Sequence, residues 1–375
     1  MEQLTSHDRE QIRQKGLTEE DIEQQIRNFR KGFPFTSLEK PARIGDGIYQ
    51  PGQIDLQHFQ QVYVQARSGL SVMKFVPASG AATRMFKSLF EYLDDPSTNV
   101  SEVERLIQNI DRFAFYQDLR DSLEKKGKDL SGLIRDRHYA EIIREWIEVG
   151  GLGYGYLPKG LIKFHRYDDH SRTPAEEHLV EGANYGMNSD RTVSIHFTVL
   201  PEHEKNFSDH LENRKAVYEK AYEIDFQIDF SNQEESTDMV AVEMNNELFR
   251  DEEGRLVFRP GGHGALLNNL NKLEEDVIFI KNIDNVVPDR FKPATYEYKK
   301  ALAGMLLEYQ HETFQYLREL EADGAYDLNR LAEILEFAQY RMNILPPPHL
   351  DTLDPKALRD FLFEKLNRPI RVCGM

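Results

Sequence analysis

The stretch from residue 72 to residue 87, VMKFVPASGAATRMFK, restricts the possible folds more than any other part of the chain. A short run of β-prone residues ends at Pro77, and the small residues 78–82 lead into a predicted helix that carries Thr83 and Arg84. A strand, a tight turn and a helix in this order are typical of α/β proteins. Small side chains also let a phosphate approach backbone N–H groups at a helix start. Such turns occur without ligands too, so the motif alone does not establish a phosphate site.

Further segments have the composition of strands, and helical segments or long connections separate them. The clearest are residues 192–199, 223–231, 238–243 and 277–280. Strands that alternate with helices in this way predict an α/β fold with a doubly wound, mixed but mostly parallel sheet and helices on both faces.

The 375 residues are enough for one large domain with additions or for two domains. We predict a helical N-terminal extension over residues 1–70 and an α/β core over residues 71–292, with a helical insertion at about 96–150. The apolar stripes of this insertion, and Trp146 within it, indicate packing rather than a cofactor site. Residues 293–375 are predicted to be largely helical and to end at the start of a strand near Ile370.

The charge of the chain excludes several classes of partner. Lys and Arg number 47 and Asp and Glu number 64, which gives a formal net charge of −17. This charge opposes nonspecific attraction to nucleic acid polymers and to anionic membranes, but it leaves open a small phosphorylated ligand held at a local basic spot. The single cysteine, Cys373, excludes an intramolecular disulfide and a Cys-based zinc cluster. The N-terminus does not resemble a secretory signal, so we expect a cytoplasmic protein without a membrane span. The oligomeric state stays open.

A second informative stretch is GGLGYGYLPKGLIKFHRY, residues 150–167. A glycine-rich loop delivers Lys159 just before a predicted strand at 161–165. A lysine held there by the preceding proline is well placed to neutralise a phosphate, although a surface lysine in a flexible loop explains the pattern equally well.

The helix predicted to start at Thr173 carries His178 with Glu177 and Glu181, which are potential metal ligands. The helix dipole already favours glutamates in a first turn, so a metal site is the weaker interpretation of this segment.

The third stretch, residues 255–290, determines the functional interpretation. PGGHG at 260–264 follows a predicted strand, and a buried strand at 277–280 ends shortly before Asp284. In open α/β sheets, ligands bind outside the carboxyl ends of the strands. A lone carboxylate there suits Mg²⁺, because phosphate oxygens and water can complete its coordination. His263, between glycines, is a candidate contact for a base or ribose, and the alternative is a loop histidine with local backbone bonds.

The segments PASGAATRM, LPKGL, RPGGHG and IKNIDN, in this order, resemble the sugar-1-phosphate nucleotidyltransferases, and most closely the UTP-using pyrophosphorylases of the nucleotide-diphospho-sugar transferase fold. The chain also looks like an uncharacterised bacterial family of unknown function that shares these segments. The resemblance covers about residues 70–290 and implies a Rossmann-like core.

The resemblance also implies roles for individual residues. Arg84 and Lys159 would act in catalysis by contacting phosphates, and Asp284 would bind Mg²⁺. The implied nucleotide-binding residues are Ser79, Gly80, Ala81, Thr83, Gly261, Gly262, His263 and Gly264. The strands before Ser79, Pro260 and Asn282 should then lie side by side in one sheet, since the loops that follow them would share the ligand.

The chain departs from the family pattern in three places. Ala82 replaces the second glycine of the phosphate loop, and the insertion at 96–150 is large. The chain also stops where pyrophosphorylases continue with sugar-binding strands and a second metal-binding carboxylate. We therefore expect either a fragment of a longer chain or a reduced sugar site.

The function that follows from these observations is transfer of a nucleotidyl group from a nucleoside triphosphate to a sugar 1-phosphate, with release of pyrophosphate. UTP is the leading candidate for the nucleoside triphosphate. Two alternatives stay open at this stage. One is a non-catalytic module that binds a nucleotide or a sugar phosphate, and the other is a glycosyltransferase that uses a nucleotide sugar. A P-loop NTPase is disfavoured, since no G-K-[ST] follows the small-residue loop.

Overall fold

The computed structural model describes residues 4–36, 38, 40–80, 82–322, 327–346, 349 and 354–374. The chain forms two compact units: Met1–Pro41 with Ser71–Asp289, and Ala42–Leu70 with Arg290–Met375. Residues 42–70 of the predicted N-terminal extension thus group with the C-terminal region, whereas residues 1–41 group with the α/β core.

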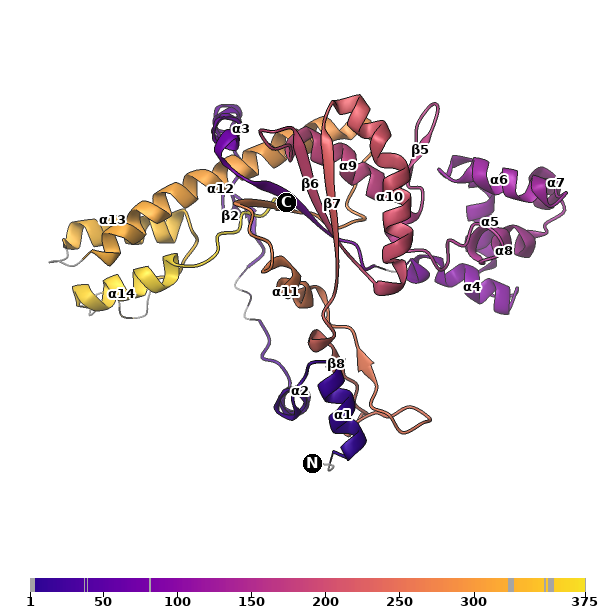
Figure 1. The fold of residues 1–375 in the computed structure, drawn as a ribbon, viewed down its shortest axis with the longest axis horizontal. Helices are drawn as coiled ribbons and strands as arrows, with labels where there is room; N and C mark the ends of the chain where they lie inside the picture. The colour runs from indigo at the N-terminus through magenta and orange to yellow at the C-terminus, as the bar shows by residue number, and fades with distance from the viewer. Residues whose placement is uncertain are drawn as a thin grey trace. The chain divides into compact units, whose positions relative to one another are not determined.

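The centre of the first unit is a four-stranded parallel sheet with the strand order β10-β3-β6-β7 (Figure 1). Its strands are β3 (Val72–Pro77), β6 (Thr192–Val199), β7 (Asp225–Asn232) and β10 (Val277–Ile280). The predicted α/β class is confirmed, and this sheet is entirely parallel rather than mixed. Because the strands are parallel, all four carboxyl ends lie at one edge of the sheet.

Helices α9 (Pro174–Tyr185) and α10 (Pro201–Tyr222) cover one face of this sheet. The core between them is built from alternate residues of β6 and β7, such as Ile195 and Phe230. The opposite face contacts the short helix α11 (Leu267–Leu270), whose Asn269 donates a hydrogen bond to Ser231 of β7 at 2.8 Å.

The helical insertion, predicted at about 96–150, occupies residues 87–147. Its helices are α4 (Lys87–Asp94), α5 (Val100–Gln108), α6 (Tyr116–Lys125), α7 (Leu130–Arg135) and α8 (Tyr139–Ile147). They share a hydrophobic core in which Trp146 packs against Phe115, with ring centroids 4.6 Å apart. The insertion therefore uses its tryptophan for packing, as the apolar pattern predicted.

The N-terminal helices α1 (Ser6–Gln14) and α2 (Glu19–Lys31) pack against a small β structure within the same unit. This structure pairs β8 (Met239–Val240) with β9 (Phe258–Arg259) in antiparallel orientation. The strand before Pro260 is β9, so the prediction that it lies in the main sheet is wrong, and the strand order gives no support to a ligand shared by the loop after Pro260 and the loops after β3 and β10. The apolar side chains of this segment contact Ile12, Ile22 and Ile26, and these contacts place the strand beside α1 and α2.

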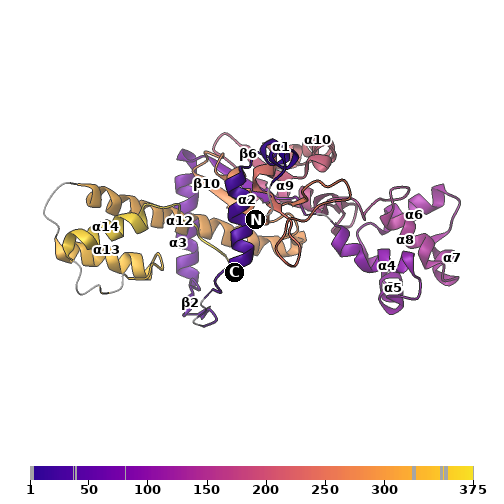
Figure 2. The ribbon, with the colours of Figure 1, turned by 90° about the horizontal axis from the view of Figure 1, so that it is seen from below.

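The second unit consists mainly of helices α3 (Gln53–Ala66), α12 (Lys292–Glu321), α13 (Leu328–Tyr340) and α14 (Pro355–Leu366). It also holds a two-residue pair of strands, β1 (Arg43–Ile44) and β2 (Gly47–Ile48). Figures 1 and 2 both show α13 and α14 side by side, joined by a shared hydrophobic core. Residues 370–374 form neither helix nor strand, so the strand predicted near Ile370 is wrong. Among the described helices, none combines the length and the apolar character that crossing a membrane requires.

Candidate functional site

The order of the strands puts a topological switch point at the carboxyl edge of the sheet, between the ends of β3 and β10, and the word crevice denotes this position beside Gly80, Lys159 and Asp284. The chain runs from β3 to β6 and β7 on one side, and β10 then pairs with the other side of β3. Successive connections therefore diverge between β3 and β10, and the crevice at such a point is the usual ligand site of open α/β sheets. Ser79 and Gly80 follow β3 there, and Asp284 follows β10.

Three of the predicted site residues meet at this crevice. The ammonium group of Lys159 lies 2.6 Å from Oδ2 of Asp284, and the backbone N–H of Lys159 donates to the carbonyl of Gly80 at 3.1 Å. Both charged side chains are partly exposed, 27% for Lys159 and 37% for Asp284. The crevice therefore presents an accessible positive and an accessible negative group beside a bare glycine.

The loop that carries Lys159 is fastened to the loop after β3. The N–H of Ala82 donates to the carbonyl of Leu157 at 3.3 Å, and the hydroxyl of Thr83 donates to the carbonyl of Gly155 at 3.3 Å. These bonds fix the loop that carries Lys159 relative to the end of β3.

Residues 159–161 form a 3₁₀ turn, and the strand predicted at 161–165 is wrong. In this turn the buried Gly160 lies against Phe207 and Ile283. The next strand, β4 (His165–Arg166), pairs only with β5 (Ser171–Arg172).

The segment after Gly80 differs from the predicted helix. Residues Thr83–Phe86 form a 3₁₀ turn, and α4 begins only at Lys87. Arg84 is exposed in this turn and makes no hydrogen bond or ion pair with another described residue. Ser79 is half-buried, and Ala81 lies outside the described residues.

The PGGHG segment reaches the same edge by a different route. Gln233, which directly follows β7, donates to the carbonyl of Gly261 at 3.3 Å. A Cβ at Gly261 would lie 2.7 Å from the carbonyl oxygen of Thr237, so only glycine fits. The segment therefore lies at the end of β7, two strands from β3, a lateral distance of about 10 Å from the strand spacing. Gly262, His263 and Gly264 are exposed there.

Beneath the crevice, helix α9 places a carboxylate between two buried lysines. Lys74 of β3 lies 2.9 Å from Oε2 of Glu181, and Lys281, just after β10, lies 2.6 Å from Oε1. Burial alone would raise the pKa of Glu181, but the two lysines hold it well below its usual range. The carboxylate therefore stays charged.

His178 of α9 supports the loop that carries Asp284. Its Nε2 lies 3.2 Å from the carbonyl oxygens of both Asn282 and Ile283, so Nε2 carries the proton and donates. Burial, assisted by Lys74, lowers the pKa of His178 and keeps the ring neutral. Glu181 is committed to its two lysines, and the described residues contain no cluster of three potential metal ligands. The arrangement thus favours a supporting role for His178 over the metal interpretation.

The sequence patterns also missed a polar network that surrounds Glu177. It joins His165, Tyr167, Arg172 and Asp289. The density of ionisable residues in HRYDDHSRTPAEEH was the available signal.

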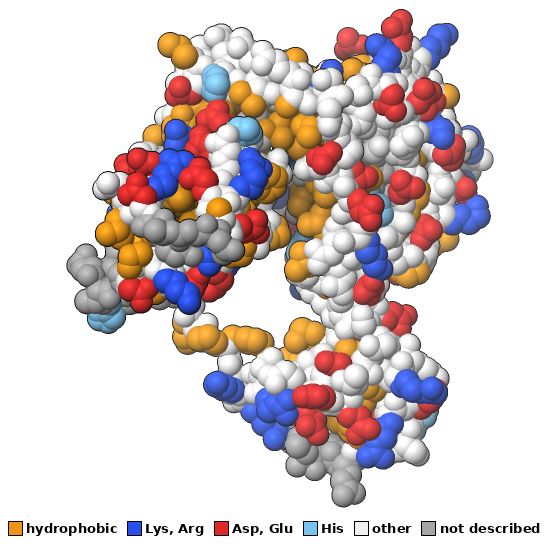
Figure 3. Space-filling model, turned by 60° about the vertical axis from the view of Figure 1, so that its left-hand side comes forward, with side chains coloured by type: hydrophobic (Ala, Val, Ile, Leu, Met, Phe, Trp, Pro, Cys, Tyr) orange, Lys and Arg blue, Asp and Glu red, His pale blue; other side chains and the backbone are white. Residues whose placement is uncertain are grey.

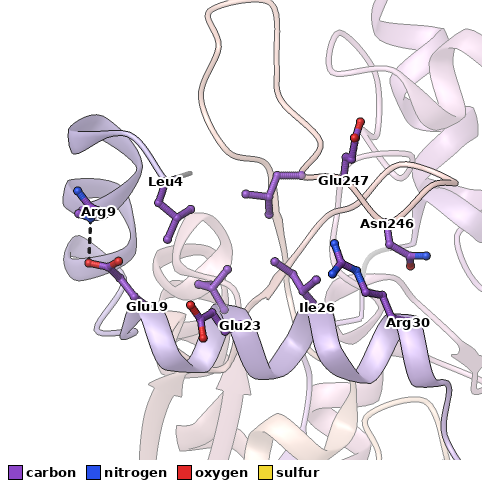
Figure 4. A pocket seen from close by; sticks show the side chains of 10 residues that line it. Leu4, Arg9, Glu19, Glu23, Ile26, Arg30, Asn246 and Glu247 are labelled. Atoms are coloured by element: carbon purple, nitrogen blue, oxygen red, sulfur yellow. Dashed lines mark hydrogen bonds and ion pairs between the residues drawn. The ribbon is translucent and has the colours of Figure 1, made fainter. Parts of the chain in front are cut away.

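A separate pocket lies between the N-terminal helices and the residues near Asn246 (Figure 4). It encloses about 210 Å³, and Arg30 and the ion-paired Arg9 and Glu19 are among its lining residues. None of the predicted site residues lines it. On the face shown in Figure 3, basic and acidic side chains are interspersed.

Two glycines of the crevice are expected to respond differently to an added methyl group. Gly160→Ala should destabilise the protein by about 1–3 kcal/mol, because the new Cβ would overlap the ring of Phe207 and lie 3.0 Å from Ile283. Gly80→Ala should cost little stability, since its Cβ would meet only Lys159 at 3.7 Å. Urea unfolding of both variants measures this difference, and equal losses would contradict the packing described here.

The comparisons with known proteins identify one family. The model of the family described as "Domain of unknown function (DUF4301)" matches residues 5–375. No curated protein and no solved structure matches the chain.

Proposed function

The chain belongs to the DUF4301 family. We propose that it transfers a nucleotidyl group from a nucleoside triphosphate to a sugar 1-phosphate and releases pyrophosphate, with UTP as the leading candidate for the triphosphate. The observation that carries this proposal is the pairing of Lys159 with Asp284 beside Gly80, in the crevice between β3 and β10.

The strand order supports a Rossmann-like core. Numbered along the chain, the four strands of the sheet have the order 4-1-2-3 from β10 to β7. Read from β7, this is the order 3-2-1-4 with which doubly wound nucleotide-binding sheets begin. In such sheets the phosphates bind after the first strand, which here is β3.

Charges near the crevice favour a phosphorylated ligand. Lys159 and the exposed Arg84 can both donate to phosphate oxygens. Gly80 carries no side chain that would keep a phosphate from the backbone. A nucleotide whose phosphates lie at Gly80 would have to extend about 10 Å across β6 for its nucleoside to reach the exposed His263.

Asp284 fits a magnesium ion that is shared with phosphates. It offers one accessible carboxylate at the strand end, and Mg²⁺ needs only one or two protein carboxylates when phosphate oxygens and water complete the octahedron. A bound Mg²⁺ would neutralise triphosphate charge. Lys159, released from Asp284, would then donate to the phosphate that is attacked, and positioning and charge neutralisation would supply the catalysis.

The test combines turnover with binding. Pyrophosphate release is measured from UTP with Mg²⁺ and a panel of sugar 1-phosphates. In parallel, UTP with Mg²⁺ should raise the melting temperature more than ATP at the same concentration, because a ligand of the native state stabilises it by mass action. Equal shifts would remove the uridine assignment. UTP binding without turnover would favour the binding module, and turnover of a nucleotide sugar alone would favour the glycosyltransferase.

A further inference from the structure

The network at the start of α9 has a histidine held by a buried carboxylate. Glu177 is fully buried, and its Oε1 accepts hydrogen bonds from Nδ1 of His165 at 2.8 Å and from the hydroxyl of Tyr167 at 2.7 Å. Burial and the nearby carboxylate of Glu177 raise the pKa of Tyr167, so its hydroxyl stays protonated and donates. Arg172 approaches the other carboxylate oxygen at 3.4 Å.

These bonds fix the proton of the imidazole ring. Because Nδ1 of His165 donates to Glu177, the neutral ring has its lone pair on Nε2. No described residue forms a hydrogen bond with Nε2, and the side chain is 16% exposed. A histidine oriented by a carboxylate, with the other nitrogen free, is the arrangement of a general base.

The histidine and the crevice are tied to the same loop. Asp284, near the start of residues 282–289, pairs with Lys159, and Asp289 at their end accepts two hydrogen bonds from Nη1 of Arg172, at 2.7 and 2.9 Å. His178, next to Glu177 on α9, donates to the carbonyls of residues 282 and 283. The N-terminal turn of α9 therefore lies at the carboxyl edge of β10, where Asp284 also lies.

We propose that His165 is the general base of a second reaction at this edge, the hydrolysis of a bound nucleoside triphosphate to nucleoside monophosphate and pyrophosphate. The oxygen of a water molecule bonds to the α-phosphorus and its proton passes to Nε2 of His165. The bond from the α-phosphorus to the bridging oxygen breaks, pyrophosphate leaves with that electron pair, and the imidazolium returns its proton to solvent. Glu177 is the positioning residue.

This inference rests on the proposed function for the location of the nucleotide, but hydrolysis requires a general base, which the transfer reaction does not. The phosphate of a sugar 1-phosphate loses its second proton near pH 6 and needs no base at pH 8. Water does need a base. The two reactions should therefore depend differently on His165.

The test uses the full chain with UTP and Mg²⁺ at pH 8, with and without sugar 1-phosphates. His165→Asn keeps a donor toward Glu177 but removes Nε2, and hydrolysis should fall at least about 100-fold while transfer falls less than about threefold. Added imidazole should partly restore hydrolysis in His165→Ala, a recovery that a purely structural role would not give. Glu177→Gln should lower kcat for hydrolysis with little change in KM. His138→Asn is the matched control, because His138 faces Glu141 on the exposed surface of α8.

Each outcome separates the two proposals. Unchanged hydrolysis in His165→Asn, equal losses in both reactions, or transfer without any hydrolysis by the unaltered chain would overturn the role of His165. Hydrolysis that depends on His165, without transfer to any sugar 1-phosphate, would support the base and overturn the transferase. The absence of both reactions would overturn both proposals.

Discussion

Replacing Asp284 by asparagine should lower pyrophosphate release in the transfer reaction at least about 100-fold, the typical cost of losing one group that stabilises transition-state charge. Asparagine keeps the size and the hydrogen-bonding capacity of the side chain but removes the charge that would hold Mg²⁺. The free energy of unfolding should change by less than about 1 kcal/mol, because the ion pair with Lys159 is partly exposed. Steady-state kinetics and urea unfolding of the same preparation measure the two effects.

The chain contains a closely matched control for this substitution. Lys163 and Asp118 form an ion pair of the same length, 2.6 Å, with side chains 34% and 37% exposed. Asp118→Asn should therefore have a similarly small effect on stability and should leave turnover unchanged. Turnover that persists in Asp284→Asn, or that falls equally in both variants, would contradict the role given to Asp284.

The largest effect on stability is expected from Glu181→Gln. The substitution leaves Lys74 and Lys281 buried without the carboxylate that now lies between them, and removing one partner of a buried ion pair typically costs about 3–5 kcal/mol. Urea unfolding measures the loss. As a control, Glu141→Gln breaks an exposed pair with Lys128 and should cost less than about 1 kcal/mol.

A triple variant separates charge from packing in the same cluster. Lys74→Met combined with Glu181→Leu and Lys281→Met replaces all three charges by apolar groups of similar volume. Such replacements are often neutral or stabilising, so the triple variant should recover most of the loss. A triple variant as unstable as Glu181→Gln would show that the cost comes from lost packing.

Local sequence patterns predicted the strands and the helix starts that depend on residues close together in the sequence. The strands of the main sheet are β-rich runs between turns, and the helix predicted to start at Thr173 does start there, with Thr173 as its N-cap. Lys159 lies beside the loop that follows β3. Small residues in that loop and in the glycine-rich loop before Lys159 let the two loops approach each other.

Long-range contacts explain where the sequence interpretation failed. The strand before Pro260 pairs with β8 because its apolar side chains pack on α1 and α2, helices more than 200 residues earlier in the chain. Residues 159–161 form a 3₁₀ turn where the predicted strand should begin, and Gly160 in this turn packs against Phe207 and Ile283. The spacing of residues along the sequence indicates neither of these contacts.

The partners of the buried charged residues could not be predicted from the sequence either. Lys74 lies in a strand and Glu181 on a helix 107 residues later, and neither position indicates that the two side chains are buried against each other. The sequence presents Glu177 as a potential metal ligand or as a glutamate that the helix dipole favours, whereas the structure surrounds it with donors from β4, β5 and the segment between them. Partners of buried charges are set by the tertiary fold, so the sequence alone could not identify them.

A crystal structure of the chain with UTP and Mg²⁺ tests the central claim most directly. The account predicts that the triphosphate lies in the crevice between β3 and β10, with phosphate oxygens at Gly80 and Lys159, the magnesium ion on Asp284 and the uridine toward His263. A nucleotide bound elsewhere on the chain, with Lys159 still paired to Asp284 in an empty crevice, would contradict it.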